Sequence, residues 1–148
     1  MTKASEPYEE VLKKNGVLVF TPGGSSMQPL LRHHENPVVL VPVTGRLRRG
    51  DVPFYKRSDG QYVLHRILRV RKDSYDCCGD NQTVLEKGVT DAMIFAKMAG
   101  FYRGEHFYSV EDKEIRRYAR RRMRSRPWRR AAALARAALR RLLKKRRP

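Results

Sequence analysis

The sequence predicts a mainly β fold: a barrel or sandwich of short strands, with a short N-terminal helix and a basic C-terminal helix. Three observations predict it. Short apolar runs separated by Gly, Pro, Asp and Asn clusters fill the middle of the chain, an acidic segment ending at a glycine precedes them, and a segment rich in Ala, Leu and Arg follows. With 148 residues, of which 41% are hydrophobic, the chain suits one compact domain with an appendage.

The N-terminal segment, residues 1–15, is expected to form a helix over residues 6–15. Ser5 can cap its first turn, and Gly16 supplies a stop signal. Acidic residues, which favour a helix N-terminus, stand at Glu6, Glu9 and Glu10. The segment lacks an apolar run, so it does not resemble a cleavable targeting signal.

Residues 16–110 are expected to form the β domain. Apolar runs that suit strands lie at residues 17–20, 38–43, 52–55, 62–70, 75–78, 93–102 and 107–110. Clusters of turn-forming residues separate them. This spacing of short strands is typical of an all-β barrel or sandwich.

Residues 111–148 form a basic tail with 17 Lys or Arg against 3 Asp or Glu, and so carry +14 of the chain's net charge of +18. Pro127 is expected to interrupt the helix that begins this tail. From Trp128 to Lys145, apolar residues recur at three- and four-residue intervals, with arginines on other faces. This pattern predicts a basic amphipathic helix.

We expect residues 128–147 to lie on an anionic membrane, because a basic helix with a tryptophan and a leucine face suits that surface. Binding of RNA or DNA is the less favoured alternative, since clustered Arg and Lys also neutralise phosphates. A solvated charged helix or a disordered end is the third. No stretch reaches the roughly 18 apolar residues of a membrane span. The predicted location is therefore peripheral at a membrane, with the cytoplasm as the alternative.

Cysteine and histidine spacing predicts no cofactor. The two cysteines, Cys77 and Cys78, are adjacent, and adjacent strand residues point to opposite faces, so no disulfide framework is expected. His33 and His34 lie in a polar loop and are expected to be solvated. No ligand spacing predicts a metal site, and we expect neither a metal nor another cofactor.

Three short strings supply the residue types of serine-dependent amide hydrolysis. In chain order they are Gly-Ser-Ser-Met-Gln-Pro at 24–29, Leu-His-Arg at 64–66 and Gly-Asp-Asn-Gln at 79–82. A serine hydroxyl is a weak nucleophile at neutral pH, so it needs a neighbouring base, and that base needs a partner that orients it. The order serine, histidine, aspartate meets this requirement.

Together with Arg-Gly-Asp-Val at 49–52, these strings resemble the signal peptidase I and SOS-repressor serine peptidase superfamily over about residues 15–105. Most bacterial members carry lysine where this chain has His65. The resemblance is therefore closest to the histidine-using branch, which is like the enzymes of the endoplasmic reticulum and of archaea. It implies a signal-peptidase-like β fold and a serine endopeptidase that cleaves peptides or precursor proteins after small residues, in signal or leader peptide processing.

The resemblance implies Ser26 as the nucleophile, His65 as the general base and Asp80 as the acid that orients the base. The histidine-using branch carries a further acidic pair about six residues after its Gly-Asp-Asn. This chain has Leu-Glu there, which makes Glu86 the second candidate for the orienting acid.

The resemblance also implies how the substrate is held. Signal peptidases often carry a hydroxyl two residues before the nucleophile, where this chain has Gly24. The oxyanion is therefore expected on the backbone N–H groups of Ser25 and Ser26. Met27 and Pro29 are expected to contact the substrate, and the Arg-Gly-Asp segment is expected to form a structural turn.

Two other functions fit the same sequence. The first is a noncatalytic β module that binds lipid or nucleic acid through its tail, because a lone histidine on an apolar strand is commonly structural and Gly-Asp-Asn-Gln is ordinary turn chemistry. The second is a self-cleaving SOS-type regulator, for which Ala99-Gly100 is the kind of bond that would be cut. The absence of a lysine base disfavours the second function.

Overall fold

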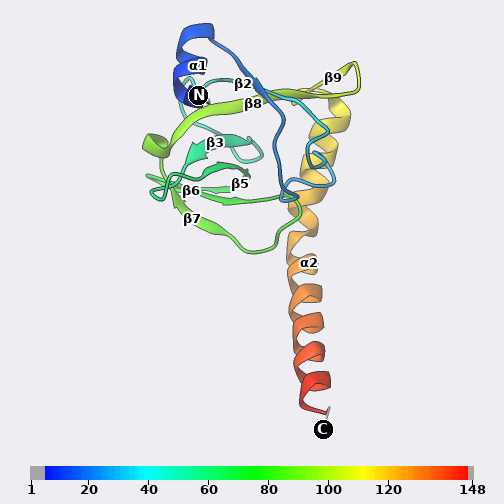
Figure 1. The fold of residues 1–148 in the computed structure, drawn as a ribbon. Helices are drawn as coiled ribbons and strands as arrows, with labels where there is room; N and C mark the ends of the chain where they lie inside the picture. Colours follow the sequence, from blue (N-terminus) through cyan, green and yellow to red (C-terminus); the bar gives the residue numbers. More distant parts are fainter. Residues whose placement is uncertain (1–5, 147–148) are drawn as a thin grey trace, which may run out of the picture.

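The structure, a computed structural model, describes residues 6–146 and has the mainly β architecture that the sequence predicts (Figure 1). Within these residues, nine strands form a curled half-barrel and a smaller sheet. A short helix stands near the N-terminus, and a long helix follows the last strand.

The larger sheet has six strands among the described residues, in the order β1-β2-β8-β3-β4, and β9 also pairs with β8. Their bounds are Leu18–Phe20 for β1, Val38–Pro42 for β2, Pro53–Lys56 for β3, Tyr62–Leu64 for β4, Ile94–Arg103 for β8 and His106–Ser109 for β9. The smaller sheet, in the order β5-β6-β7, comprises Arg66–Val70, Tyr75–Cys78 and Glu86–Val89. A 3-10 turn, η1 at Asp91–Met93, leads into β8. All pairings are antiparallel.

Strand β8 is the centre of the larger sheet, because β2 pairs along one side of it while β3 and then β9 pair along the other. The register shifts twice along β8, once opposite Val39 and Leu40 and once opposite Phe54 and Tyr55. Bulges of this kind bend a strand and increase its twist. They account for the curl of the sheet around its core.

Two apolar clusters fill the interior. The first lies inside the curl of the larger sheet and joins α1, the turn after β1 and the start of the last helix; its fully buried members are Leu30, Val38, Leu40, Phe54, Ala96 and Phe101. The second lies where the smaller sheet meets the larger one, and contains Tyr55, Ile67, Tyr75, Cys77 and Val89. The chain between the two sheets passes between these clusters.

The apolar run at residues 62–70 forms two strands, in contrast to the single strand predicted. β4 pairs with β3 in the larger sheet, whereas β5 pairs with β6 in the smaller sheet. His65 is the residue between them, so it lies where the chain crosses from one sheet to the other. Apolar periodicity reports that a segment is extended, but it does not report which partner each half of the segment finds.

Helix α1 spans Tyr8–Asn15 and confirms the predicted N-terminal helix. It begins after Pro7 and ends at Gly16, which has a φ of +70° that glycine adopts readily. The predicted cap, Ser5, lies outside the described residues. The ring of Tyr8 packs against Phe20 and Tyr62, which fixes α1 across the open edge of the larger sheet.

Helix α2 spans Lys113–Lys145 without a break, so the prediction that Pro127 interrupts it is wrong. Pro127 has no N–H to donate to the carbonyl of Met123 four residues earlier, yet the helix continues through it. Close to this position, the Ser125 hydroxyl donates to the Arg122 carbonyl at 3.1 Å and Arg129 donates to the same carbonyl at 3.4 Å. Buried Ile115 anchors the first half of α2 to the domain. Figure 1 shows α2 running along the domain and then projecting beyond it.

Among residues 6–146, no helix is both long enough and apolar enough to cross a membrane.

Candidate active site

Ser26 and His65 line one cavity of about 500 Å³. Its walls come from α1, the turn after β1 and the β3–β4 hairpin, and include the apolar side chains of Met27, Leu31, Phe54 and Tyr62. The structure therefore brings the first and second sequence strings together. Met27 is buried in this wall, whereas Pro29 is exposed and is not among the residues that line the cavity.

The third string, Gly79 to Gln82, fixes the backbone of the serine turn. The N–H of Asn81 donates to the Ser26 carbonyl at 2.8 Å, and the Asn81 side-chain amide donates to the Ser25 carbonyl at 3.2 Å. Gly79 is the close-approach point, because a Cβ there would lie 2.6 Å from the Ser26 carbonyl oxygen. A glycine at this position is therefore needed for the Ser26 turn to keep its place.

The backbone donors of the serine turn are available to a ligand. Within residues 6–146, the N–H groups of Ser25 and Ser26 make no hydrogen bond to another residue. Gly24 has a φ of +87°, and its N–H donates to Nδ1 of His33 at 2.6 Å. His33 is exposed, as predicted, but it also holds the turn, a role that its polar loop did not indicate.

His65 is 6% exposed and lines the cavity. Its Nδ1 is enclosed without a hydrogen bond, and the nearest acid is Glu86, whose Oε2 is 3.6 Å away. Nε2 is consequently the ring nitrogen that can exchange a proton with a group bound in the cavity. Burial lowers the pKa of His65 although Glu86 opposes the shift, so the ring is neutral at pH 7 and can accept a proton.

Glu86 is an ionised carboxylate beside this ring. It accepts hydrogen bonds from the Tyr55 hydroxyl at 2.6 Å and from Arg57 Nε and Nη2 at 2.7 and 2.8 Å. The hydrogen bonds from Arg57 contribute most to lowering the pKa of Glu86. A negative charge thus stands ready to stabilise a protonated His65.

Asp80 has a different partner. Its carboxylate is buried and accepts two hydrogen bonds of 2.8 Å from Arg66 and one of 3.0 Å from the Tyr118 hydroxyl. The sequence-based prediction ranked Asp80 ahead of Glu86 as the acid that orients His65. Glu86 is the acid that lies beside His65, whereas Asp80 pairs with the buried Arg66 guanidinium.

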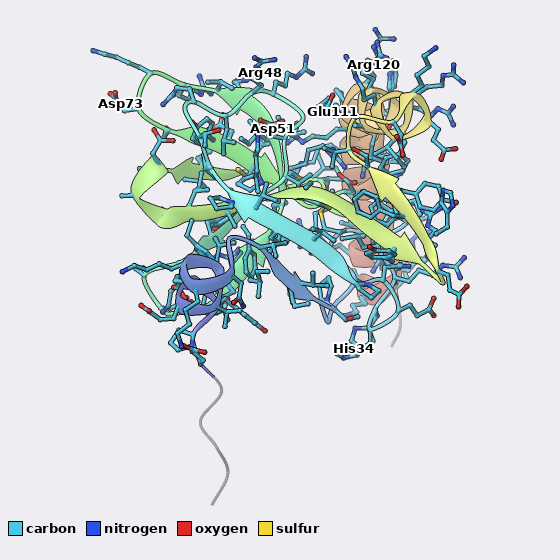
Figure 2. All side chains as sticks on the ribbon, turned by 90° about the horizontal axis from the view of Figure 1, so that it is seen from above. His34, Arg48, Asp51, Asp73, Glu111 and Arg120 are labelled. Carbon is cyan, nitrogen blue, oxygen red and sulfur yellow. The ribbon has the colours of Figure 1, made fainter. Side chains whose placement is uncertain are left out.

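The Arg-Gly-Asp segment forms the turn before β3 and supports Arg66 from behind. Gly50 donates its N–H to the Ile67 carbonyl at 2.8 Å, and Arg66 Nη1 donates to the Gly50 carbonyl at 2.9 Å. Figure 2 shows the labelled residues of this turn, Arg48 and Asp51, on the same side of the molecule as Arg120 of α2. The same segments border a cavity of about 310 Å³.

Helix α2 holds the loop after Gly79 through side chains that donate to backbone carbonyls. Arg122 reaches the Asp80 carbonyl at 2.7 Å, and Arg129 reaches the Asp80 and Gln82 carbonyls at 3.1 and 3.2 Å. Arg126 reaches the Thr83 carbonyl at 2.8 Å. The first half of the tail thus holds the loop that contacts the serine turn. The uniform charge of the tail did not indicate this contact.

Comparison of the chain with protein-family models, with curated proteins and with solved structures finds no match.

Other reactive groups lie away from the cavity. Cys77 and Cys78 are free, buried thiols, and burial raises the pKa of Cys77 to about 12, so this thiol is protonated at neutral pH. Within residues 6–146 there is no group of three or more His, Cys, Asp or Glu side chains placed to hold a metal ion. Ser26, by contrast, is a hydroxyl-bearing residue that lines the same cavity as a histidine.

Proposed function

We propose that the chain is a serine endopeptidase of the signal-peptidase type, acting on peptides or precursor proteins and cutting after small residues. The observation that carries the proposal is the shared cavity: Ser26 and a neutral, buried His65 line it together, and ionised Glu86 stands behind the ring. This arrangement supplies a nucleophile, a base and a charge that stabilises the protonated base.

In the proposed mechanism, Nε2 of His65 takes the Ser26 hydroxyl proton as Oγ attacks the scissile carbonyl. The backbone N–H groups of Ser25 and Ser26 stabilise the oxyanion. His65 then gives its proton to the leaving amine, and water hydrolyses the acyl-enzyme. Ser26 and His65 are not hydrogen-bonded to each other in this structure, and catalytic hydrogen bonds commonly tighten only when substrate binds.

The position of the cavity between two edges of the larger sheet supports the same proposal. β1 and β4 stand at the two ends of the strand order of the larger sheet, and residues of both strands line the cavity. An edge strand has unpaired backbone N–H and C=O groups, so an extended peptide can add to it as a further strand. The apolar side chains of Met27, Leu31 and Phe54 in the cavity wall suit an uncharged side chain next to the cut bond.

The test is a mass-spectrometric map of cuts in a pool of signal-peptide-like and random peptides. We expect cuts after small residues with the wild-type protein and none with Ser26→Ala. Ser25→Ala is the matched control, because the proposed contribution of Ser25 comes from its backbone; it should keep most cuts. Equal maps for the wild type and Ser26→Ala, with both proteins folded, would overturn the proposal in favour of a noncatalytic module.

Self-cleavage at Ala99-Gly100 is disfavoured by the position of this bond. It lies within β8, the strand that has neighbours on both sides. The Ala99 carbonyl accepts the Val110 N–H at 3.0 Å, and a Cβ on Gly100 would lie 2.3 Å from the Phe107 ring. Attack on this bond would require the central strand to leave the sheet, so we do not propose an SOS-type regulator.

We further propose that the projecting half of α2 binds an anionic membrane surface. Trp128, Leu139 and Leu142 fall on one helical face and are 80%, 57% and 61% exposed. Arg136 and Lys145 lie to either side of that face, and Arg140 and Lys144 lie further round the helix. An exposed apolar face beside basic side chains suits the boundary between lipid headgroups and acyl chains. The same binding, without cleavage, would fit the noncatalytic alternative.

Trp128 is the single tryptophan of the chain and reports this binding directly. We expect its fluorescence to shift to shorter wavelength when vesicles of phosphatidylcholine and phosphatidylglycerol are added. Leu139→Gln should weaken vesicle binding about tenfold, because one leucine would leave the apolar phase. Val70→Gln, which removes a part-exposed apolar residue from β5, should not. No shift with vesicles, together with tight binding to an oligonucleotide, would replace the membrane with nucleic acid as the partner.

A further inference from the structure

A second groove, of about 650 Å³, lies between the candidate active site and helix α2. Three residues, Arg57, His65 and Gln82, line both this groove and the first cavity. The two cavities are therefore neighbours, and a peptide bound at Ser26 could extend past the shared residues toward the groove. Residues 81–86 form one wall of the groove and α2 forms the other.

The groove is lined by four arginines against one carboxylate. The arginines are Arg57, Arg122, Arg129 and Arg136, and the carboxylate is Glu86, which Arg57 already pairs. Arg122 and Arg129 are held by backbone carbonyls, contacts that fix a guanidinium group without cancelling its charge. Burial and the nearby charge of Arg122 lower the pKa of Arg129, as expected where positive charges are crowded.

Arg136 is the member of this set that is free to meet a ligand. It is exposed, and within residues 6–146 it makes no hydrogen bond or ion pair. It lies about two helical turns beyond Arg129 on the same face of α2, so the two guanidinium groups follow one line along the groove. The two positions are about 10 Å apart along the helix, which is about three residues of an extended peptide, so a run of acidic residues can place a carboxylate near each guanidinium. Guanidinium and carboxylate groups form paired hydrogen bonds.

We propose that this groove binds an acidic segment of the substrate, on one flank of the bond that Ser26 attacks. The inference rests on the proposed peptidase function and adds a substrate class to it: peptides in which a small residue at the cut adjoins Asp or Glu. A peptide is favoured over a nucleic acid as the occupant because the groove shares Arg57, His65 and Gln82 with the Ser26 cavity and is also lined by apolar Val84, Leu85 and Ala133. These side chains suit a polypeptide of mixed character.

The test measures binding apart from cleavage, with the full-length Ser26→Ala protein. The probes are pairs of fluorescent peptides that contain the same site with a small residue. One member of each pair carries a run of aspartates beside the site, and the other carries asparagines at the same positions. One pair has this run before the site, and a second pair has it after the site. Arg136→Gln is compared with Arg141→Gln, a matched control that removes the same charge from an exposed position of α2 that does not line the groove.

We expect the aspartate peptide to bind about tenfold more tightly than the asparagine peptide on one flank. Arg136→Gln should reduce this ratio of affinities about fivefold, and Arg141→Gln should leave the ratio unchanged. Added salt should also reduce the ratio. Equal affinities for the two peptides, or equal losses in the two variants, would overturn the inference. An oligonucleotide that binds more tightly than the peptide and depends on Arg136 would also overturn it, in favour of nucleic acid.

Cleavage of the same peptides by the wild-type protein separates the two proposals. Cleavage without any preference for aspartate would refute the acidic-segment proposal and leave the peptidase proposal standing. Arg136-dependent binding of the aspartate peptide without cleavage would support the groove and refute the peptidase.

Discussion

Replacing His65 by alanine is expected to lower kcat/KM for peptide cleavage by about 10³- to 10⁴-fold, since Ser26 would lose its general base. The fold should survive, because Nδ1 of His65 makes no hydrogen bond that the change would break and Glu86 would keep its bonds from Tyr55 and Arg57. The measurement is kcat/KM on a cleaved peptide alongside urea unfolding. His106→Ala, on β9 and away from the cavity, is the control and should stay active.

The proposed role of His65 as the base also predicts how kcat/KM of the wild-type protein depends on pH. Burial lowers the pKa of His65 below its ordinary value of about 6.5, and only the neutral ring accepts the Ser26 proton. kcat/KM should therefore be constant around neutral pH and fall only when the pH drops below 6.5, through the lowered pKa. An activity that instead rises through the alkaline range would indicate a base of higher pKa and contradict the role of His65.

The free energy of unfolding should also depend on the protonation of His65. Between the lowered pKa of His65 and about 6.5, the unfolded chain binds a proton that the folded chain does not, so the free energy of unfolding rises with pH across that window. In His65→Ala, this part of the rise should disappear.

Local patterns predicted most strands but not the element that carries Glu86. All seven predicted apolar runs coincide closely with strands or, at residues 62–70, with two strands, because burial selects apolar residues in extended segments. Strand β7, with the sequence Glu-Lys-Gly-Val, has one apolar residue and no alternation, and it forms because β6 supplies its partner. The acid beside His65 therefore depends on a pairing that no local pattern encodes.

The partners of the charged side chains could not be predicted from the sequence either. Arg66 follows His65 directly and reads as an ordinary strand residue, yet it is the buried partner of Asp80. The arginines of α2 read as one uniform run, but three of them bind the backbone of the loop that supports Ser26. The serine and histidine strings were sufficient to predict that Ser26 and His65 lie at one site, whereas which acid lies beside His65 and which pairs with Arg66 could be seen only in the structure.

Glu86→Gln is expected to act mainly on catalysis, whereas Asp80→Asn is expected to act mainly on stability. Glu86→Gln removes the charge beside His65 and should lower kcat by about 10²-fold or more, since a protonated His65 would no longer face a carboxylate. Its side chain is 25% exposed, so the fold should lose only about 1–2 kcal/mol from weakened bonds to Tyr55 and Arg57. Both quantities are measured on the same preparation, by steady-state kinetics and urea unfolding.

Asp80→Asn should instead lower the free energy of unfolding by about 3–5 kcal/mol, because the Arg66 guanidinium would stay buried without a counter-charge. The fraction of this variant that remains folded should keep a kcat within about tenfold of the wild type, the residual loss coming from the loop that holds Ser26. Asp76→Asn is the matched control: it breaks a bond from Arg71 to a buried carboxylate in the smaller sheet, outside the cavity. It should cost stability without changing kcat. If Asp80→Asn lowers kcat strongly in folded protein while Glu86→Gln does not, the acid that orients His65 is Asp80, and the resting distance of 3.6 Å between His65 and Glu86 marks a neighbour without a catalytic role.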